Sequence, residues 1–581
     1  MREAKNNILL YRMAVFILSF GLLPFFMIAQ DSLSKQLYYA CINQDVQLAQ
    51  NLYNSITDDD LKQLPDSSLF RYHYLGAYLN GEITSNDQKT IEHCLKAKAI
   101  CEQSYGVNRN DYQDILFELG TAYLNTGKFE DALEIFQEGI VKSISFDNML
   151  GTYNYSNLAL GVQECYELMG HIDESLPYFY EAWNNYSLKN KEPFSHHNYY
   201  PLWCLEQFYY RYEMYDKALE VADEIIDFVS ANAGQEHPTL AQELYFKGNI
   251  LVDSNRHSEA VDIYYRALAI LDSNDMGIDK TYGRIASNLL LSIIHTNRWQ
   301  ECDKILKIHK DYCMRASKPE LYNETIVAAV ISLNKIGTYA KAIELIEMAS
   351  KLNLSEELKS HIEYQRKNIL FNKEITDSLP KLTEHYSALP KESAEWFDVG
   401  CKLSNAYYLR KEIDKNYDIL IALYDAIKKG ASSGADYKYW VLQQLCGLCF
   451  EREKYDDALK YATEKWSIVS VFPEARDFDL YYALNELVVA KIRTNHLNNI
   501  DVDFEKLDAI CKRLYGTESK QYATVLHNRG RAYQLQGRLD DAKQCFTKSI
   551  SLQISNNGKP KRTVQYLKEL EKTLIYDETD F

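Results

Sequence analysis

The feature that most constrains the fold of this chain is an internal repeat. Two segments far apart in the sequence carry the same kinds of residue at the same spacings. They read Leu119-Gly120-x-x-Tyr123-x-x-x-Gly127-x-Phe129-x-x-Ala132-x-x-x-Phe136 and Arg529-Gly530-x-x-Tyr533-x-x-x-Gly537-x-Leu539-x-x-Ala542-x-x-x-Phe546. Small residues let two helices approach closely, and aromatic rings fill the space around such a contact. Each segment therefore predicts a pair of packed helices with a glycine turn between them.

The small position of the second helix recurs along nearly the whole chain, and eleven of its thirteen occurrences are Ala, Ser, Thr or Cys. Aligned on the second helix of each pair, it falls at Ala49, Thr90, Ala132, Ser175, Ala218, Ala260, Cys302, Ala342, Ser378, Asn416, Ala458, Ile500 and Ala542. The mean step between these positions is about 41 residues, a period typical of repeat architectures. A single hydrophobic core stops growing at roughly 250–300 residues, so a chain of 581 residues fits a stacked array better.

These motifs resemble the tetratricopeptide repeat (TPR), and the long period resembles its kinesin-light-chain-like variant, since the common form has about 34 residues. The resemblance implies an all-α fold, a right-handed α-solenoid of stacked antiparallel helix pairs, also called a TPR superhelix. Roughly 24–27 helices are expected over this length. Counts of only 23 Gly and 11 Pro agree with a helical chain, because loop-rich β folds need more turn residues.

The spacing of the repeat also predicts a division of the chain. The step shortens around Ser378, and Pro380 and Pro390 interrupt the helical pattern there. We therefore expect an N-terminal TPR array over residues 31–388, a C-terminal TPR array over 389–560, and a capping helix and tail over 561–581. The expected capping helix has an apolar face made of Val564, Leu567, Leu570 and Leu574.

The first thirty residues have the pattern of an export signal. Arg2, Lys5 and Arg12 precede an apolar run over 13–28, and Ala29 follows it. The run is shorter than the ~20 residues that a spanning helix needs. The pattern predicts a signal peptide over 1–30, with an uncleaved membrane anchor as the alternative. We therefore expect an exported protein, periplasmic or associated with the cell envelope of a Gram-negative bacterium, that meets the membrane only through this segment if it stays uncleaved.

The charge of the chain bears on its partners. With 64 Lys and Arg against 82 Asp and Glu, the net charge is −18. Nucleic-acid binding needs a basic footprint, so DNA and RNA are not expected partners. An acidic chain favours a neutral or basic partner instead.

Four motifs raise the question of catalysis or metal binding. Gly430-Ala431-Ser432-Ser433-Gly434 matches the nucleophile-elbow pattern, but that turn follows a strand, whereas the preceding segment here is predicted to be helical. Cys446 and Cys449 form a C-x-x-C pair without a second pair for zinc, at positions where the repeat packs small or aromatic residues. The glycines are expected to end a helix and the cysteines to pack in the core.

The other two motifs are His196-His197 and Asp58-Asp59-Asp60, which are expected in loops or at helix starts. The chain contains no H-E-x-x-H, P-loop or dinucleotide-binding motif. We therefore expect a protein that is not an enzyme and that has no cofactor and no metal site.

The resemblance implies a binding surface on the first helices of the pairs, which line the concave groove in this family. Transferring that register gives the candidate partner-binding residues Phe117, Trp203, Gln207, Tyr210, Tyr245, Asn249, Asn405, Tyr408, Phe450 and Arg531. Asn249 and Asn405 match the asparagine that bonds a ligand backbone. The paired lysines of chaperone-type carboxylate clamps have no counterpart at these positions.

Two consecutive first helices supply the most prominent part of this surface. Trp203, Gln207 and Tyr210 lie on one, and Tyr245 and Asn249 lie on the next. Trp and Tyr are over-represented among interface hot spots, so this surface is predicted to dock a peptide or protein. The alternative is that Trp203 and Tyr245 pack between repeats.

The leading functional hypothesis is an exported, non-enzymatic scaffold that binds peptide or protein partners on the concave TPR surface. One alternative is the sensor or regulatory half of a larger signalling or caspase-like protease system, which requires a longer chain or a neighbouring gene. A further alternative is a glycan-uptake accessory protein. Such proteins usually carry a lipoprotein cysteine and long loops rich in Gly and Trp, which this sequence lacks.

Overall fold

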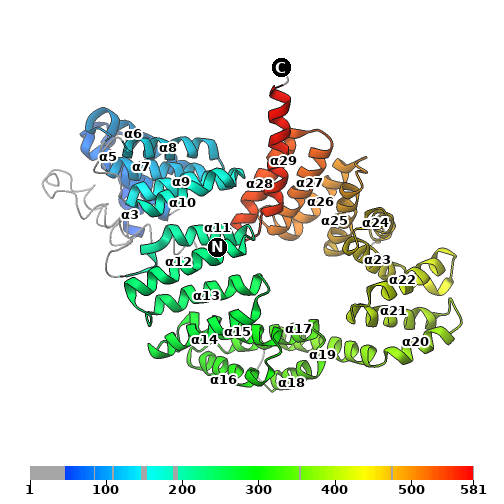
Figure 1. Ribbon diagram of the computed structural model, residues 1–581. Helices are drawn as coiled ribbons and strands as arrows, with labels where there is room; N and C mark the ends of the chain where they lie inside the picture. Colours follow the sequence, from blue (N-terminus) through cyan, green and yellow to red (C-terminus); the bar gives the residue numbers. More distant parts are fainter. Residues whose placement is uncertain are drawn as a thin grey trace. The chain divides into compact units, whose positions relative to one another are not determined.

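The computed structural model describes residues 46–83, 85–107, 110–144, 153–186, 194–351, 355–472 and 476–579. Within these ranges the chain forms twenty-seven α-helices, α3 to α29, and no β-strand (Figure 1). The predicted signal peptide lies outside the described residues. Among the helices of the described part, none is long and apolar enough to cross a membrane.

The chain divides into two compact units. Unit 1 is Met1–Ala233 together with Phe546–Phe581, and unit 2 is Gly234–Cys545. The predicted boundary between two repeat arrays at residue 388 stays a prediction, and the two units are described separately below.

Unit 1 joins helices from both ends of the sequence. Its helices are α3 (Val46–Ser55), α4 (Asp58–Gln63), α5 (Asp66–Tyr78), α6 (Asp87–Ile100), α7 (Asn110–Asn125), α8 (Phe129–Ile144), α9 (Tyr153–Met169), α10 (Ile172–Asn184), α11 (Tyr200–Arg211), α12 (Tyr215–Ala233), the end of α28 (Leu539–Ser555), and α29 (Lys561–Thr579). Short π-helices follow α5 and α6, and a 3-10 helix, η4 (His196–Tyr199), precedes α11.

Unit 2 is continuous in sequence. Its helices are α13 (Pro238–Asp253), α14 (His257–Ser273), α15 (Lys280–His295), α16 (Trp299–Arg315), α17 (Pro319–Lys335), α18 (Tyr339–Ala349), α19 (Glu356–Asp377), α20 (Leu379–Ala388), α21 (Ala394–Leu409), α22 (Ile413–Lys428), α23 (Lys438–Glu451), α24 (Tyr455–Val469), α25 (Asp477–Arg493), α26 (Ile500–Tyr515), α27 (Lys520–Leu535) and the start of α28.

Consecutive helices pack as the repeat motif predicts. A Cβ atom on Gly120 of α7 would lie 2.5 Å from the ring of Phe136 on α8, and one on Gly248 of α13 would lie 2.3 Å from the ring of Tyr264 on α14. Only glycine leaves room for a ring at that distance. The turns after the first helices hold Gly127, Gly170, Gly337 and Gly537 in the left-handed region, with φ between 75° and 87°. Both roles predicted for glycine are confirmed.

The small residue of the second helix is buried as expected. Of the thirteen positions in the register, twelve are buried, from Ala49 to Ala542. The exception is Ser378, which is half-buried and lies between α19 and α20 instead of inside a second helix. The predicted solenoid of stacked antiparallel helix pairs is confirmed, and α19–α20 is the place where the pairs change form.

Neighbouring pairs are joined by polar contacts about one repeat apart in sequence. Asn125 donates to Asp87 over 2.9 Å, Tyr424 donates to Glu464 over 2.9 Å, and Arg538 bonds Asp501 at 3.0 Å. These partners are separated by 38, 40 and 37 residues. Such spacings are expected where each pair stacks on the next.

The C-terminal helix α29 packs within unit 1. Its residues Val564, Leu567 and Leu570 are buried, in agreement with the predicted apolar face, while the side chain of Leu574 lies outside the described residues. Leu567 and Ile550 both contact the turn between α9 and α10 at Gly170. The end of the sequence therefore contributes to the packing of α9 and α10.

Candidate functional site

The candidate partner-binding residues lie on first helices of pairs, as the repeat register requires. Their helices are α7, α11, α13, α21, α23 and α27, and all are half-buried except Tyr408, whose exposed fraction is 50%. Phe117 and the three residues of α11 belong to unit 1, and the others belong to unit 2. We therefore describe two surfaces: the α11 surface (Trp203, Gln207, Tyr210) and the α13–α15 surface (Tyr245, Asn249, Asn288).

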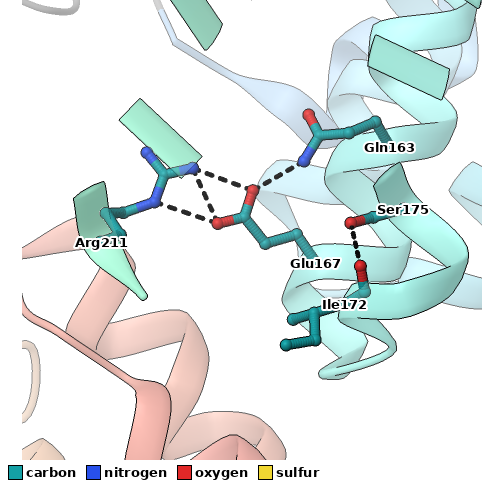
Figure 2. A network of polar contacts seen from close by, with 5 residues as sticks. All are labelled: Gln163, Glu167, Ile172, Ser175 and Arg211. Carbon is teal, nitrogen blue, oxygen red and sulfur yellow. Dashed lines mark hydrogen bonds and ion pairs between the residues drawn. The ribbon is translucent and has the colours of Figure 1, made fainter. Parts of the chain in front are cut away.

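Helix α11 is held against α9 by a buried ion pair (Figure 2). The Arg211 guanidinium bonds the Glu167 carboxylate through Nε at 3.0 Å and through Nη2 at 2.7 and 2.9 Å. Gln163 donates to the same carboxylate over 2.7 Å, and Glu167 is only 3% exposed. Burial alone would lower the pKa of Arg211, but the Glu167 carboxylate outweighs it and the pKa is raised. Removing one partner of a buried pair costs about 3–5 kcal/mol, so this network fixes α11.

On the α11 surface, Trp203 belongs to an aromatic cluster at the start of the helix. Its indole stacks on Tyr200 at 5.8 Å and meets His196 edge-on at 5.1 Å. Its Nε1 atom is buried and has no hydrogen-bond partner among the described residues. Gln207, one turn later, donates to Glu206 over 3.2 Å. Trp203 therefore contributes to packing while it remains half-exposed.

Tyr210 is in contact with the C-terminal segment of the same chain. The Lys559 ammonium lies 5.1 Å from the centre of the Tyr210 ring and 5.2 Å from that of Tyr215. This residue of the predicted surface thus already has an intramolecular neighbour.

The α13–α15 surface is organised by Asn249. Its Oδ1 atom accepts a hydrogen bond from the Tyr264 hydroxyl and another from Asn288 Nδ2, both at 2.8 Å. The Tyr245 ring lies 5.6 Å from Phe246 and 6.4 Å from Tyr264. Asn249 therefore connects a core tyrosine to the neighbouring first helix, and Tyr245 and Asn288 flank it as half-exposed side chains.

Asn288 was missed by sequence reasoning, although a signal for it exists. It lies 39 residues after Asn249, close to one repeat length. Two more asparagine pairs in unit 2 follow the same rule: Asn372 donates to Asn334 at 3.1 Å, and Asn528 donates to Asn485 at 3.3 Å. Recurrence of asparagine at the repeat spacing would have found all three pairs.

The remaining candidates have mostly local neighbours. Phe117 lies 6.1 Å from Phe136, Phe450 lies 6.4 Å from Tyr455, and Arg531 donates to Gln534 over 2.7 Å. Asn405 and Tyr408 share α21. Their role in binding stays a prediction.

The possible catalytic motifs have the packing roles that the sequence predicts. Gly430 has φ +90° just after α22, and the 3-10 helix Ser432–Tyr437 follows it, so the segment runs from helix to helix. Cys446 and Cys449 are buried on α23, and burial raises the pKa of both thiols, that of Cys449 to about 11. A neutral buried thiol packs as a small apolar group.

The histidine and aspartate motifs are likewise part of the local structure. His196 bonds the Tyr199 hydroxyl at 3.2 Å within η4. Asp60 lies in the first turn of α4 and forms a capping box with Thr57, whose hydrogen bonds lower the pKa of Asp60. Across the part of the chain that the structure describes, no three His, Cys, Asp or Glu side chains are grouped to hold a metal ion.

Comparison with known families matches two parts of the chain. Tetratricopeptide repeat models match residues 113–140 and residues 503–555. These two segments are tetratricopeptide repeats. The first covers most of α7 and α8, and the second extends from the first turn of α26 to the end of α28.

Comparison with solved structures finds several to which this chain is similar, among them the following three. The apo form of RapI is 13% identical, with coverage of 69% of this chain and 99% of that one and a TM-score of 0.40. The TPR-like repeats of a putative kinesin light chain from Podosopora anserina are 12% identical, with coverage of 44% and 98% and a TM-score of 0.25. A Rap protein complexed with Competence and Sporulation Factor is 11% identical, with coverage of 67% and 98% and a TM-score of 0.27. No curated protein sequence matches the chain.

Proposed function

We propose that this protein is an exported, non-enzymatic scaffold that binds a peptide or protein partner on the first helices of its repeats. The observation that supports the proposal best is the α13–α15 surface. There, Tyr245, Asn249 and Asn288 come from two first helices that lie next to each other, and their side chains are half-exposed.

The chemistry of this surface suits a polypeptide ligand. An asparagine side chain offers both a donor and an acceptor, as a peptide bond does. The Oδ1 atom of Asn249 accepts hydrogen bonds from Tyr264 and Asn288. These bonds fix the side-chain amides of Asn249 and Asn288, so their remaining donors and acceptors have one orientation. Tyr245 adds a rigid aromatic face of the kind that dominates interface hot spots.

The charge of the chain supports a neutral or basic partner. The net charge is −18, and complementary charge increases the rate and specificity of association. We therefore expect partner binding to weaken as salt concentration rises.

The binding proposal is tested by capture from the native host with the full chain and with Tyr245→Ala. We expect Tyr245→Ala to reduce the captured partner by about tenfold, with little change in melting temperature. The matched control is Asp262→Ala on α14, an exposed residue of a second helix that should leave capture unchanged. Equal capture by all three proteins would contradict the proposal.

For the α11 surface the decisive variant is Trp203→Ala. If the indole binds a partner, melting should change little while affinity falls by about 2 kcal/mol or more. A loss of about 3–5 kcal/mol of stability with affinity retained would assign Trp203 to packing alone.

The export part of the proposal rests on the basic residues and the apolar run at the N-terminus. Fractionation of the native host with N-terminal sequencing tests it. We expect the protein in the periplasm or cell envelope, and recovery in the cytosol with Met1 intact would contradict export.

A further inference from the structure

Within unit 1, residues 559–571 near the C-terminus are held by both polar and apolar contacts. Lys559, in the linker between α28 and α29, donates a hydrogen bond to the Tyr215 hydroxyl at 2.8 Å. Its ammonium also lies against the rings of Tyr210 and Tyr215, at 5.1 and 5.2 Å from their centres. Two aromatic faces and a hydroxyl around one ammonium form a site for a lysine.

Beyond Lys559, the segment lies on unit 1 as an amphipathic helix. Val564, Leu567 and Leu570 of α29 are buried, and they recur every three residues along one face. Leu567 approaches Gly170 so closely that a Cβ atom there would lie 2.5 Å from Leu567 Cδ2. The absence of a side chain at Gly170 therefore makes room for this leucine.

Pairs of oppositely charged side chains surround the apolar contact. Lys568 bonds Asp173 at 2.6 Å, and Lys561 lies 3.8 Å from Glu213. At the other end, Glu571 lies 3.2 Å from His171. Apart from this last contact, the segment brings positive charge to an acidic surface.

We propose that this surface of unit 1 is a receptor site for a lysine-bearing amphipathic helix, and that residues 559–571 occupy it in cis until a partner helix of the same chemistry replaces them. We call it the C-terminal docking surface, made of Gly170, His171, Asp173, Tyr210, Glu213 and Tyr215. The partner helix has apolar residues at every third position along one face. One lysine lies N-terminal to these apolar residues, and a second lysine lies beside them.

The contacts explain why the segment can be replaced. The ion pairs are at least partly exposed to solvent, and such pairs each contribute little to stability. Among the described side chains of α29, the buried apolar ones are Val564, Leu567 and Leu570. Attachment to the same chain gives the segment a high effective concentration. A partner helix must compete with this effective concentration. Occupancy of the surface by residues 559–571 therefore determines how tightly a partner helix must bind to replace them.

The identity of the partner rests on the proposed scaffold function, whereas the receptor site does not. A labelled synthetic peptide of residues 557–579 therefore serves as the probe. Its Kd is measured for the full-length protein and for Leu567→Glu, which places a charge in the apolar contact and releases the segment in cis. The matched control is Gln565→Ala on the exposed face of α29.

We expect the peptide to bind Leu567→Glu at least tenfold more tightly than it binds the unaltered protein or Gln565→Ala. Equal Kd values for all three proteins, or no binding to Leu567→Glu, would overturn the proposal. Binding of the peptide together with a failure of Tyr245→Ala to affect partner capture would overturn the scaffold surface on unit 2 and leave this proposal standing.

A second pair of variants keeps the test valid if Leu567→Glu disturbs folding. Asp173 and Lys568 are both accessible, so reversing their charges should not unfold the chain. Lys568→Glu and Asp173→Lys should each accelerate hydrogen exchange in residues 561–571 severalfold, and the double variant should restore slow exchange. Unchanged exchange in both single variants would contradict the docking surface.

Discussion

The pair α13–α14 and the segment α19–α20 lie in the same unit but are packed very differently. In α13–α14, Gly248 faces the Tyr264 ring and Ala260 is completely buried. In α19, a helix of 22 residues, the described buried residues are Ile362, Ile369 and Ile375. The following helix, α20, buries Leu379 alone among its residues.

The difference follows from which side chains meet between the helices. Gly248 and Ala260 let α13 and α14 approach, so the Tyr264 ring is enclosed on all sides. At the corresponding place after α19, Ser378 ends one helix and Pro380 stands in the first turn of the next. Both regions form helices. The stability that comes from packing an apolar face is much smaller in α19–α20 than in α13–α14.

The largest effect expected from this comparison is that of Tyr264→Ala. The side chain is completely buried and bonds Asn249, so its loss should destabilise the protein by about 3–5 kcal/mol. Tyr364→Ala on α19, where the tyrosine is 62% exposed, should change stability by less than about 0.5 kcal/mol. Urea unfolding of both variants measures the difference, and similar losses would remove the contrast between the two regions.

Acid should destabilise unit 2 through His309, which lies on α16 and is bonded to Thr325 of α17. Burial lowers the pKa of this histidine from 6.5 to about 4, and its Nε2 lies 2.9 Å from Thr325 Oγ1. The unfolded chain therefore takes up this proton at a higher pH than the folded chain does. Through this group the folded state loses about 3 kcal/mol of stability as pH falls from above 6.5 to 4.

The variant His309→Gln removes this titration, so its stability should fall less steeply with acid than that of the unaltered protein. His361→Gln on the exposed surface of α19 is the control for the substitution itself, and its stability at neutral pH should equal that of the unaltered protein. Parallel profiles for the unaltered protein and His309→Gln would contradict the prediction.

A smaller loss is expected from Gly248→Ala. The added methyl group would lie 2.3 Å from the Tyr264 ring, so the ring or the helix must move. Overpacking of this kind costs about 1–3 kcal/mol. Thermal unfolding measures it, and a neutral result would show that the contact between α13 and α14 is looser than described.

The smallest effect has the opposite sign. Gly447 lies inside α23, and a Cβ atom there would meet no atom within 4 Å. Gly447→Ala should therefore stabilise the protein by about 0.5–1 kcal/mol, because alanine favours the helix. A loss of stability would mean that this glycine has a packing role like that of Gly248.

The sequence predicted the helix pairs well because their packing depends on residue types at fixed spacings. Gly120 and Gly248 follow directly from the repeat pattern, since each has an aromatic ring so close that no larger side chain fits. The small residues of the second helices follow from it as well, and they are buried. The break at α19–α20 was also visible, in the shortened spacing and in Pro380.

The contacts of the binding surface were harder to predict, because they join helices that only stacking brings together. The bond between Asn249 and Asn288 depends on the rotation of α15 against α13, which the sequence pattern does not specify. The contact of Lys559 with Tyr210 joins residues far apart in the chain, and the local pattern around Lys559 does not indicate it. The apolar face of α29 was predicted, but not the surface that it covers.

The central claim is that partners bind first helices and not second helices, and site-specific photocrosslinking tests it most directly. A photoreactive phenylalanine analogue is placed at Tyr245 on α13 or at Asp262 on α14, where the carboxylate side chain is 78% exposed. We expect the analogue at Tyr245 to crosslink a discrete partner in the native host, and we expect no crosslink from the analogue at Asp262. Crosslinks formed from Asp262 alone would contradict it.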